Sequence, residues 1–132
     1  MALGRNWAAD KAIEGDEATP VGEFYICAKN PRSKYFRSLC ISYPNAEDAE
    51  RGRAAGLITA VEHAEILAAI RLHRMPPQHT RLGGEIYIHG HDGTQPNDKL
   101  RDWTRGCIAL DNLAMQALYD RATVGTPVFI SV

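Results

Sequence analysis

The stretch "DWTRGCIAL", residues 102–110, places a glycine and a cysteine between a charged loop and an apolar run. Gly106 has no Cβ, so the backbone can turn sharply there and aim its N–H groups toward one point. Cys107 follows at the start of the apolar run. It is either a small buried side chain or a nucleophile presented on a turn. The rest of the sequence has to decide between these interpretations, and with them the fold.

The composition sets outer limits on fold and function. The 132 residues, 45% of them hydrophobic, suffice for one globular domain, which we assign to residues 1–132. A formal net charge of −1 and the lack of a basic run give no support for a nucleic-acid surface. No apolar stretch approaches the roughly 20 residues of a membrane span. The first 20 residues lack a signal-peptide pattern, which leaves a cytoplasmic protein or a chain without its targeting segment as alternatives.

Local patterns predict an α+β domain with a β-rich core. Strand formers at 21–27 and alternating residues at 34–44 predict a hairpin that turns at 30–33. A capping box from Thr59 to Glu62 begins a helix over 60–74. The other expected elements are a short helix or turn at 45–56, a strand at 83–90, a loop at 91–102, a helix at 111–122 and a buried strand at 126–132.

Two of the three cysteines, Cys27 and Cys40, fall on the predicted hairpin. Reflecting the hairpin about a turn near Arg32 places Cys27 closer to residue 37 than to Cys40. We therefore expect two buried thiols that are not paired with each other. The odd total leaves at least one cysteine free or bonded to another chain. The Cys and His spacing fits no zinc site, so we expect no metal.

A second stretch, "IYIHG" at 86–90, ends a predicted strand with a histidine. A thiol with a pKa near 8.5 needs a base to become a nucleophile at neutral pH. His89, 18 positions before Cys107, is the candidate base. The N–H of Cys107 and those of Arg105 or Gly106 are candidates for an oxyanion hole. The Arg105 guanidinium favours a thiolate and can also hold a carboxylate.

Together these stretches resemble the motifs of the YkuD-type L,D-transpeptidases, bacterial enzymes that remodel peptidoglycan. One stretch supplies the family's leading His-Gly and the other its Ser/Thr-x-Gly-Cys-apolar block, at the family's separation. "TPVGEF", at 19–24, matches the family's TPxGxF element, and the likeness covers nearly the whole chain. The residues that match the paired blocks are His89, Gly90, Thr104, Gly106, Cys107 and Ile108.

The resemblance implies a YkuD-like fold, a mixed sheet or sandwich with inserted helices, and a two-step acyl transfer without a cofactor. Cys107 would attack the carbonyl between meso-diaminopimelate and the terminal D-Ala of a peptidoglycan stem. His89 would take the thiol proton and return it to the leaving amine. An amine acceptor would then complete a 3→3 cross-link. Substrate contacts are expected from Gly90, Trp103, Thr104 and Arg105.

The resemblance carries further expectations about partners and place. Carbapenem-type inhibitors should acylate Cys107, and the site of action should be periplasmic or secreted. Family domains usually begin with a strand pair ahead of "LGRN", and Met1 falls just before that segment. We therefore expect a fold without that pair, whether the chain is a minimal member, a fragment or the product of a late start. Arg105 and Ala109 replace the family's second His and its usual Asn or Arg, which bears on substrate preference.

Three alternatives stay open. With water as the acceptor, the same site would be an L,D-carboxypeptidase or an endopeptidase, and a secreted interbacterial toxin is compatible with the missing signal. A non-catalytic peptidoglycan-binding module is a different class, but it has no need for the intact His89 and Cys107. The third alternative is an unrelated small α+β domain with a structural cysteine.

Overall fold

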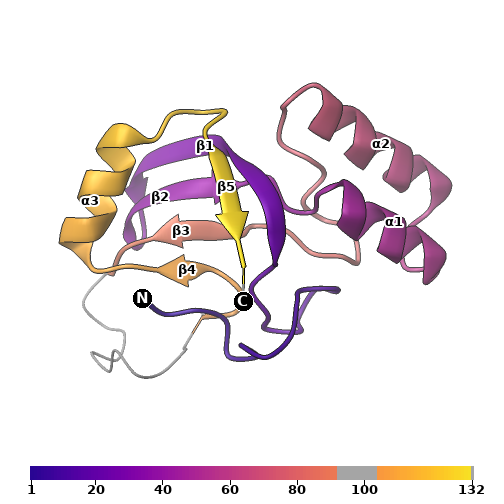
Figure 1. The fold of residues 1–132 in the computed structure, drawn as a ribbon, viewed down its shortest axis with the longest axis horizontal. Coiled ribbons are helices and arrows are strands. Elements are labelled where there is room, and N and C mark those ends of the chain that lie inside the picture. Colours follow the sequence, from indigo (N-terminus) through magenta and orange to yellow (C-terminus); the bar gives the residue numbers. More distant parts are fainter. Residues whose placement is uncertain (92–103, 132) are drawn as a thin grey trace.

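The computed structural model describes residues 1–91 and 104–131, which form a five-stranded sheet and three helices. The sheet curls, with α1 and α2 beside one end and α3 beside the other (Figure 1). This α+β architecture confirms the predicted fold class. The elements are β1 (Gly22–Ser33), β2 (Phe36–Ile41), α1 (Ala46–Ala54), α2 (Ala60–Arg71), β3 (Tyr87–His89), β4 (Ile108–Ala109), α3 (Asn112–Arg121) and β5 (Pro127–Ile130).

The sheet has the strand order β4-β3-β2-β1-β5. β1 pairs antiparallel with β2 and β5, and β2 pairs antiparallel with β3. β3 and β4 run parallel, so the two motif stretches are direct neighbours in space. The first residues of the chain continue this edge, because Ala2 bridges Ala109 and Gly4 bridges Thr104. The pairing therefore gathers both motifs and the N-terminal segment at one side of the sheet.

The main core lies between one face of the sheet and α3. Side chains that are partners across β2, β3 and β4, namely Leu39, Ile88 and Ile108, point into it together with Met115 of α3. A smaller cluster between α1 and α2 is built on Ala49, Ile58, Ile66 and Leu82. The capping box predicted at Thr59 is present, since Thr59 and Glu62 exchange side-chain to backbone hydrogen bonds of 2.9 and 3.1 Å.

The hairpin turn and the last strand differ from the sequence predictions. β1 runs through 30–33, and its Ser33 pairs with Phe36, so the turn lies at 34–35. An irregularity between Asn30 and Ser33 takes up the proline there, as bulges commonly do. The last strand is not buried, because β5 is an edge strand with β1 as its one neighbour, and Phe129 is 72% exposed. Strand propensity does not distinguish an edge from a centre.

The register also corrects the expected placement of Cys27. Ile26 pairs with Ile41 and Ala28 with Cys40, so Cys27 is an extra residue beside Cys40 rather than opposite residue 37. Reflecting the hairpin about a turn near Arg32 gave the wrong neighbour because the turn lies further along the chain and β1 contains this bulge. Cys40 is buried as expected, but Cys27 is only half-buried.

Smaller differences concern element lengths. The helix expected over 60–74 ends at Arg71, and the strand expected over 83–90 is confined to β3. The segment at 45–56, left open between helix and turn, forms α1. The loop predicted at 91–102 lies outside the described residues except for its first residue.

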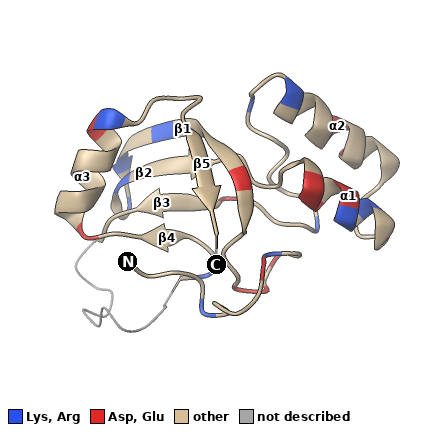
Figure 2. Ribbon diagram, viewed as in Figure 1, with Lys and Arg blue, Asp and Glu red and all other residues tan. Residues whose placement is uncertain are grey.

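Acidic and basic residues are interspersed along α1, α2 and the segment before β1 (Figure 2). No helix in the described part of the chain is long and apolar enough to cross a membrane.

Candidate active site

The two faces of the sheet carry different chemistry. Side chains of paired residues point to the same face, and successive residues alternate between faces. Leu39 and Ile88 are partners and face the core, so the flanking pairs face the other way. Those pairs are Ser38 with His89 and Cys40 with Tyr87. The face opposite the core therefore carries hydroxyl, thiol and imidazole groups, and the candidate site is built on it.

Cys107 lies one residue before β4, at the end of a turn that begins at Thr104. The Thr104 hydroxyl donates to the Cys107 carbonyl over 2.6 Å and accepts from the N–H of Gly106 over 3.2 Å. The backbone of Thr104 bonds to that of Leu3 and Arg5, which ties the turn to the N-terminal segment. The structure thus places Thr104 as a buried brace of the turn that presents the thiol.

Gly106 is required at the centre of this turn for two reasons. Its φ of +131° is one that side-chain-bearing residues rarely adopt. A Cβ at this position would also lie 2.8 Å from the Ala18 carbonyl oxygen and 3.0 Å from Cδ1 of Ile86. The turn is therefore packed against the segment before β1, and any side chain at this position would strain it.

The Cys107 thiol contacts the backbone on the approach to β3. Its Sγ accepts from the N–H of Tyr87 over 3.4 Å and donates to the carbonyl of Glu85 over 3.5 Å. Burial raises the pKa of Cys107, while the Tyr87 N–H and the positive charge of Lys11 act in the opposite direction and Glu85 adds to the rise. The resting group is therefore a thiol that needs a base. Glu85 itself has a positive φ of 54°, unusual for a residue with a side chain.

His89 ends β3 in a closed environment. It is 3% exposed, its ring stacks on Tyr35 with centroids 4.6 Å apart, and its Nδ1 bonds to the Gly90 carbonyl oxygen over 2.7 Å. Burial lowers the pKa of His89 and the nearby His91 adds to this, whereas the Gly90 carbonyl opposes it. The imidazole is therefore neutral near pH 7, the state in which it can accept a proton.

Gly90 and Asn112 hold this end of β3 against α3. A Cβ on Gly90 would lie 2.3 Å from Oδ1 of Asn112, so glycine permits the close approach of the helix. Asn112 accepts from the His91 N–H over 2.7 Å and donates to the His91 carbonyl over 3.2 Å. Gly90 is thus a packing position beside His89. Neither Asn112 nor Tyr35 was found from the sequence, where nothing marks a first-turn asparagine or a residue at a hairpin tip as part of a site.

The thiol faces a pocket of about 510 Å³. Its walls come from the loop before β1, the segment 78–86 and the turn at 104–107. Arg105 is exposed and lines this pocket, and its contact with substrate stays a prediction. The other charged side chains that line it are Lys11, Glu14, Glu17 and Glu85. Groups of both signs therefore surround the thiol.

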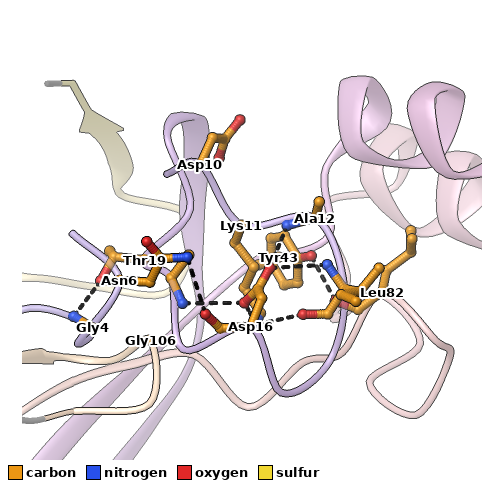
Figure 3. Close-up of polar contacts among 12 residues, drawn as sticks. Gly4, Asn6, Asp10, Lys11, Ala12, Asp16, Thr19, Tyr43, Leu82 and Gly106 are labelled. Atoms are coloured by element: carbon orange, nitrogen blue, oxygen red, sulfur yellow. Dashed lines mark hydrogen bonds and ion pairs between the residues drawn. The ribbon is translucent and has the colours of Figure 1, made fainter. Parts of the chain in front are cut away.

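Lys11, which lines this pocket, forms a part-buried ion pair with Asp16 (Figure 3). Lys11 Nζ lies 2.9 Å from Oδ1 of Asp16, and the exposed fractions of the two side chains are 3% and 16%. Asp16 also accepts from the N–H groups of Ala12, Ile13 and Ala18. Burial raises the pKa of Asp16, but these N–H groups and Lys11 outweigh that effect, and the net pKa lies below the usual value. In the sequence, only a polar segment marks the position of this pair.

The structure places His89, at the end of β3, and Cys107, just before β4, toward the same face of the sheet. His89 pairs with Ala109, and Cys107 stands two residues before Ala109, so the two side chains share a face. In the described part of the chain, the thiol bonds to the backbone rather than to His89. The hydrogen bond between a nucleophile and its base is often long without substrate and tightens when substrate binds. Trp103, predicted as a substrate contact, lies outside the described residues.

Potential metal ligands do not cluster in the described residues. Within 1–91 and 104–131, no three His, Cys, Asp or Glu side chains lie close enough together to hold a metal ion.

Comparison with known proteins gives the site a family context. The family model for the YkuD L,D-transpeptidase catalytic domain matches residues 1–130. Two solved structures of the helical cell shape determining protein Pgp2 from Campylobacter jejuni, one of them a mutant, match with 28% and 27% identity and TM-scores of 0.62. Each match covers 97% of this chain and 35% of Pgp2, so the chain spans about a third of that protein.

A third structure supports the fold alone. Bd1075 of Bdellovibrio bacteriovorus has 18% identity and a TM-score of 0.56, over 98% of this chain and 36% of its own. No curated protein sequence matches the chain.

Proposed function

Because the chain belongs to the YkuD family of L,D-transpeptidase catalytic domains, which act on peptidoglycan, we propose that Cys107 transfers acyl groups of peptidoglycan stem peptides. The bond cleaved joins meso-diaminopimelate to the terminal D-Ala, and an amine is the acceptor. One observation carries this proposal: a cysteine on a glycine turn faces a charged pocket and shares a sheet face with a buried, neutral histidine.

The first chemical step forms a thioester. The Cys107 thiol gives its proton to the His89 imidazole, and the sulfur attacks the stem carbonyl. The tetrahedral intermediate collapses as the C–N bond breaks, and the imidazolium returns the proton to the D-Ala amine. Because the Gly106 N–H is already donated to Thr104, the N–H groups of Arg105 and Cys107 are the proposed oxyanion donors. An oxyanion donor of this kind contributes about 3–4 kcal/mol.

The second step passes the acyl group to an amine. An amine of a second stem attacks the thioester, the C–S bond breaks, and the thiolate recovers a proton. The pocket suits this exchange, because Arg105 can hold a stem carboxylate while Glu14 and Glu85 attract an ammonium group. Action on peptidoglycan places the activity in the periplasm or outside the cell. We extend to this chain the part in cell shape that is stated for Pgp2.

The test is mass spectrometry of stem peptides after incubation with the purified chain. Disaccharide-tetrapeptides are the donors, and the Cys107→Ser variant is compared with Cys27→Ser as a matched control. We expect 3→3 dimers from the wild type and from Cys27→Ser, and none from Cys107→Ser. Tripeptides without dimers would show that water is the acceptor and that the activity is that of an L,D-carboxypeptidase. Unchanged tetrapeptides with folded wild-type chain would overturn the proposal and favour a binding module.

Inhibitor labelling isolates the first half-reaction. A carbapenem should add its mass to the intact wild-type chain, and peptide mapping should place the adduct on Cys107. Cys107→Ser should stay unmodified. An adduct on Cys27 or Cys40 instead would show that Cys107 is not the reactive thiol.

A further inference from the structure

Two thiols that the acyl transfer does not use lie side by side in the sheet. Cys40 is the last residue but one of β2, and Cys27 is the extra residue of a bulge in β1 beside it. The thiol of Cys27 donates to the Cys40 carbonyl over 3.5 Å. Bulges commonly re-aim a side chain, and this one directs Cys27 toward its neighbour across the strands. Directly opposed residues of antiparallel strands have Cα atoms about 4.5–5.5 Å apart, and Cys27 stands one residue before Ala28, the partner of Cys40. A disulfide spans Cα separations of about 4.4–6.8 Å.

The two thiols differ in exposure and in acidity. Cys27 is half-buried and reachable from solvent, whereas Cys40 is 2% exposed. The neighbouring Cys40 side chain lowers the pKa of Cys27, although burial opposes it. The Cys27 side chain and burial raise the pKa of Cys40, whose thiol donates to the Ile41 carbonyl over 3.6 Å. Redox-active cysteines combine these properties, an accessible low-pKa thiol beside a second thiol that resolves the reaction.

We propose that Cys27 and Cys40 form a redox-active dithiol that small-molecule disulfides, of the glutathione type, oxidise to an intrachain disulfide. The Cys27 thiolate attacks one sulfur of the oxidant and releases one thiol, which leaves a mixed disulfide on Cys27. Cys40 then loses its proton and attacks the Cys27 sulfur, and the second thiol leaves. The oxidant is reduced to two thiols, and the chain loses two hydrogens.

The third thiol lies outside this exchange. Cys40 is the partner of Tyr87 on β3, and the Tyr87 N–H bonds to Cys107 on the next strand. Two strand spacings, roughly 9–10 Å, therefore separate Cys40 from Cys107. This exceeds the Cα separation of about 7 Å beyond which a disulfide needs backbone movement. The charge of Cys107 adds to the raised pKa of Cys40, but the spacing keeps Cys107 out of the disulfide, so the test of the dithiol does not depend on acyl transfer.

The experiment uses the full chain with Cys107→Ser, incubated with oxidised glutathione and analysed by intact mass and peptide mapping. We expect the loss of two hydrogens and a 27–40 cross-linked peptide, reversed by dithiothreitol. Adding Cys40→Ser should leave one stable glutathione on Cys27, because no resolving thiol remains. Adding Cys27→Ser should leave the folded chain unmodified, because Cys40 is buried.

Three results would overturn the dithiol. The first is a Cys107→Ser chain that stays unmodified. The second is a Cys107→Ser chain with stable glutathione adducts and no cross-link. The third is equal modification of the two chains that also carry Cys27→Ser or Cys40→Ser. Circular dichroism establishes that each variant is folded. Mapping of the oxidised wild-type chain gives the same answer if Cys107→Ser fails to fold. Because Cys107 is absent or mapped separately, failure of the acyl-transfer proposal leaves this outcome unchanged.

Discussion

The imidazole and the thiol of the candidate site lie on neighbouring strands but in opposite surroundings. His89 is enclosed beneath Tyr35 and packed beside the α3 start, and burial lowers its pKa. Cys107 instead follows a turn and faces the pocket with its charged walls. The closed side suits a base whose proton must not be lost to solvent, and the open side suits the group that meets substrate. The contrast therefore divides the proposed reaction between two environments.

The largest expected effect is on the closed side. We expect His89→Gln to lower the rate of thioester formation by about 10²–10⁴-fold, the usual contribution of a positioned general base. The rate is measured by the growth of the carbapenem adduct on the intact chain. His79→Gln is the matched control, because His79 lines the open pocket and is exposed.

The control should retain at least a third of the rate. If His79→Gln lost as much activity as His89→Gln, the enclosed position of His89 would not set it apart as the base. The proposed division between a closed and an open side would then be wrong.

The next effect concerns the wall of the open side. Lys11→Met removes the buried ammonium that pairs with half-buried Asp16, and we expect it to destabilise folding by about 2–3 kcal/mol, because a charge-assisted hydrogen bond is lost while Asp16 keeps its three N–H donors. Arg5→Met, the control, breaks the exposed Arg5–Glu17 pair and should cost less than about 1 kcal/mol. Urea denaturation measures both. Equal losses would show that the wall does not depend on the buried pair.

A smaller effect tests the glycine turn that presents the thiol. Gly106→Ala meets both a positive φ and a close carbonyl, whereas Gly125→Ala meets a positive φ of 97° with open space around it. Both should lose about 1 kcal/mol from the backbone conformation, and Gly106→Ala roughly 1 kcal/mol more from overpacking. Only Gly106→Ala should also slow carbapenem labelling. Equal stability losses would contradict the close packing of the turn.

The sequence was sufficient for the fold class and for the strand, glycine and cysteine at the centre of the site. A capping box and helical spacing predicted α2, and alternation predicted β2, because these signals arise from contacts between near neighbours in the chain. The turn at 34–35, the bulge at Cys27 and the exposure of β5 escaped prediction. Each depends on which strand lies alongside, which local patterns do not report.

Within the candidate site, the sequence predicted the reacting groups but not the residues that support them. The roles predicted for His89 and Cys107 remain predictions, although parallel pairing of β3 and β4 places both side chains on one face. Asn112 and the Lys11–Asp16 pair have ordinary local contexts. Their importance comes from partners 21 and 5 residues away, as the hydrogen bonds show. Tertiary partners of this kind leave no periodic trace in one sequence.

The smallest expected effect is a pH dependence that belongs to the closed side alone. Burial lowers the pKa of His89 in the folded chain below the value of about 6.5 for an exposed histidine. Above that value both states hold a neutral imidazole. As the pH falls, the unfolded chain takes up the proton first, so the folded state loses stability until the folded pKa is reached.

The difference in free energy of unfolding between wild type and His89→Gln isolates this contribution. Asp48 also titrates in this range, because burial raises its pKa to about 6, but it is present in both chains and cancels. We expect the wild type to lose stability relative to His89→Gln as the pH falls below 6.5, as measured by urea denaturation at several pH values. A difference that stays constant with pH would show that solvent reaches His89 as readily in the folded chain as in the unfolded one, and the two sides of the site would no longer differ.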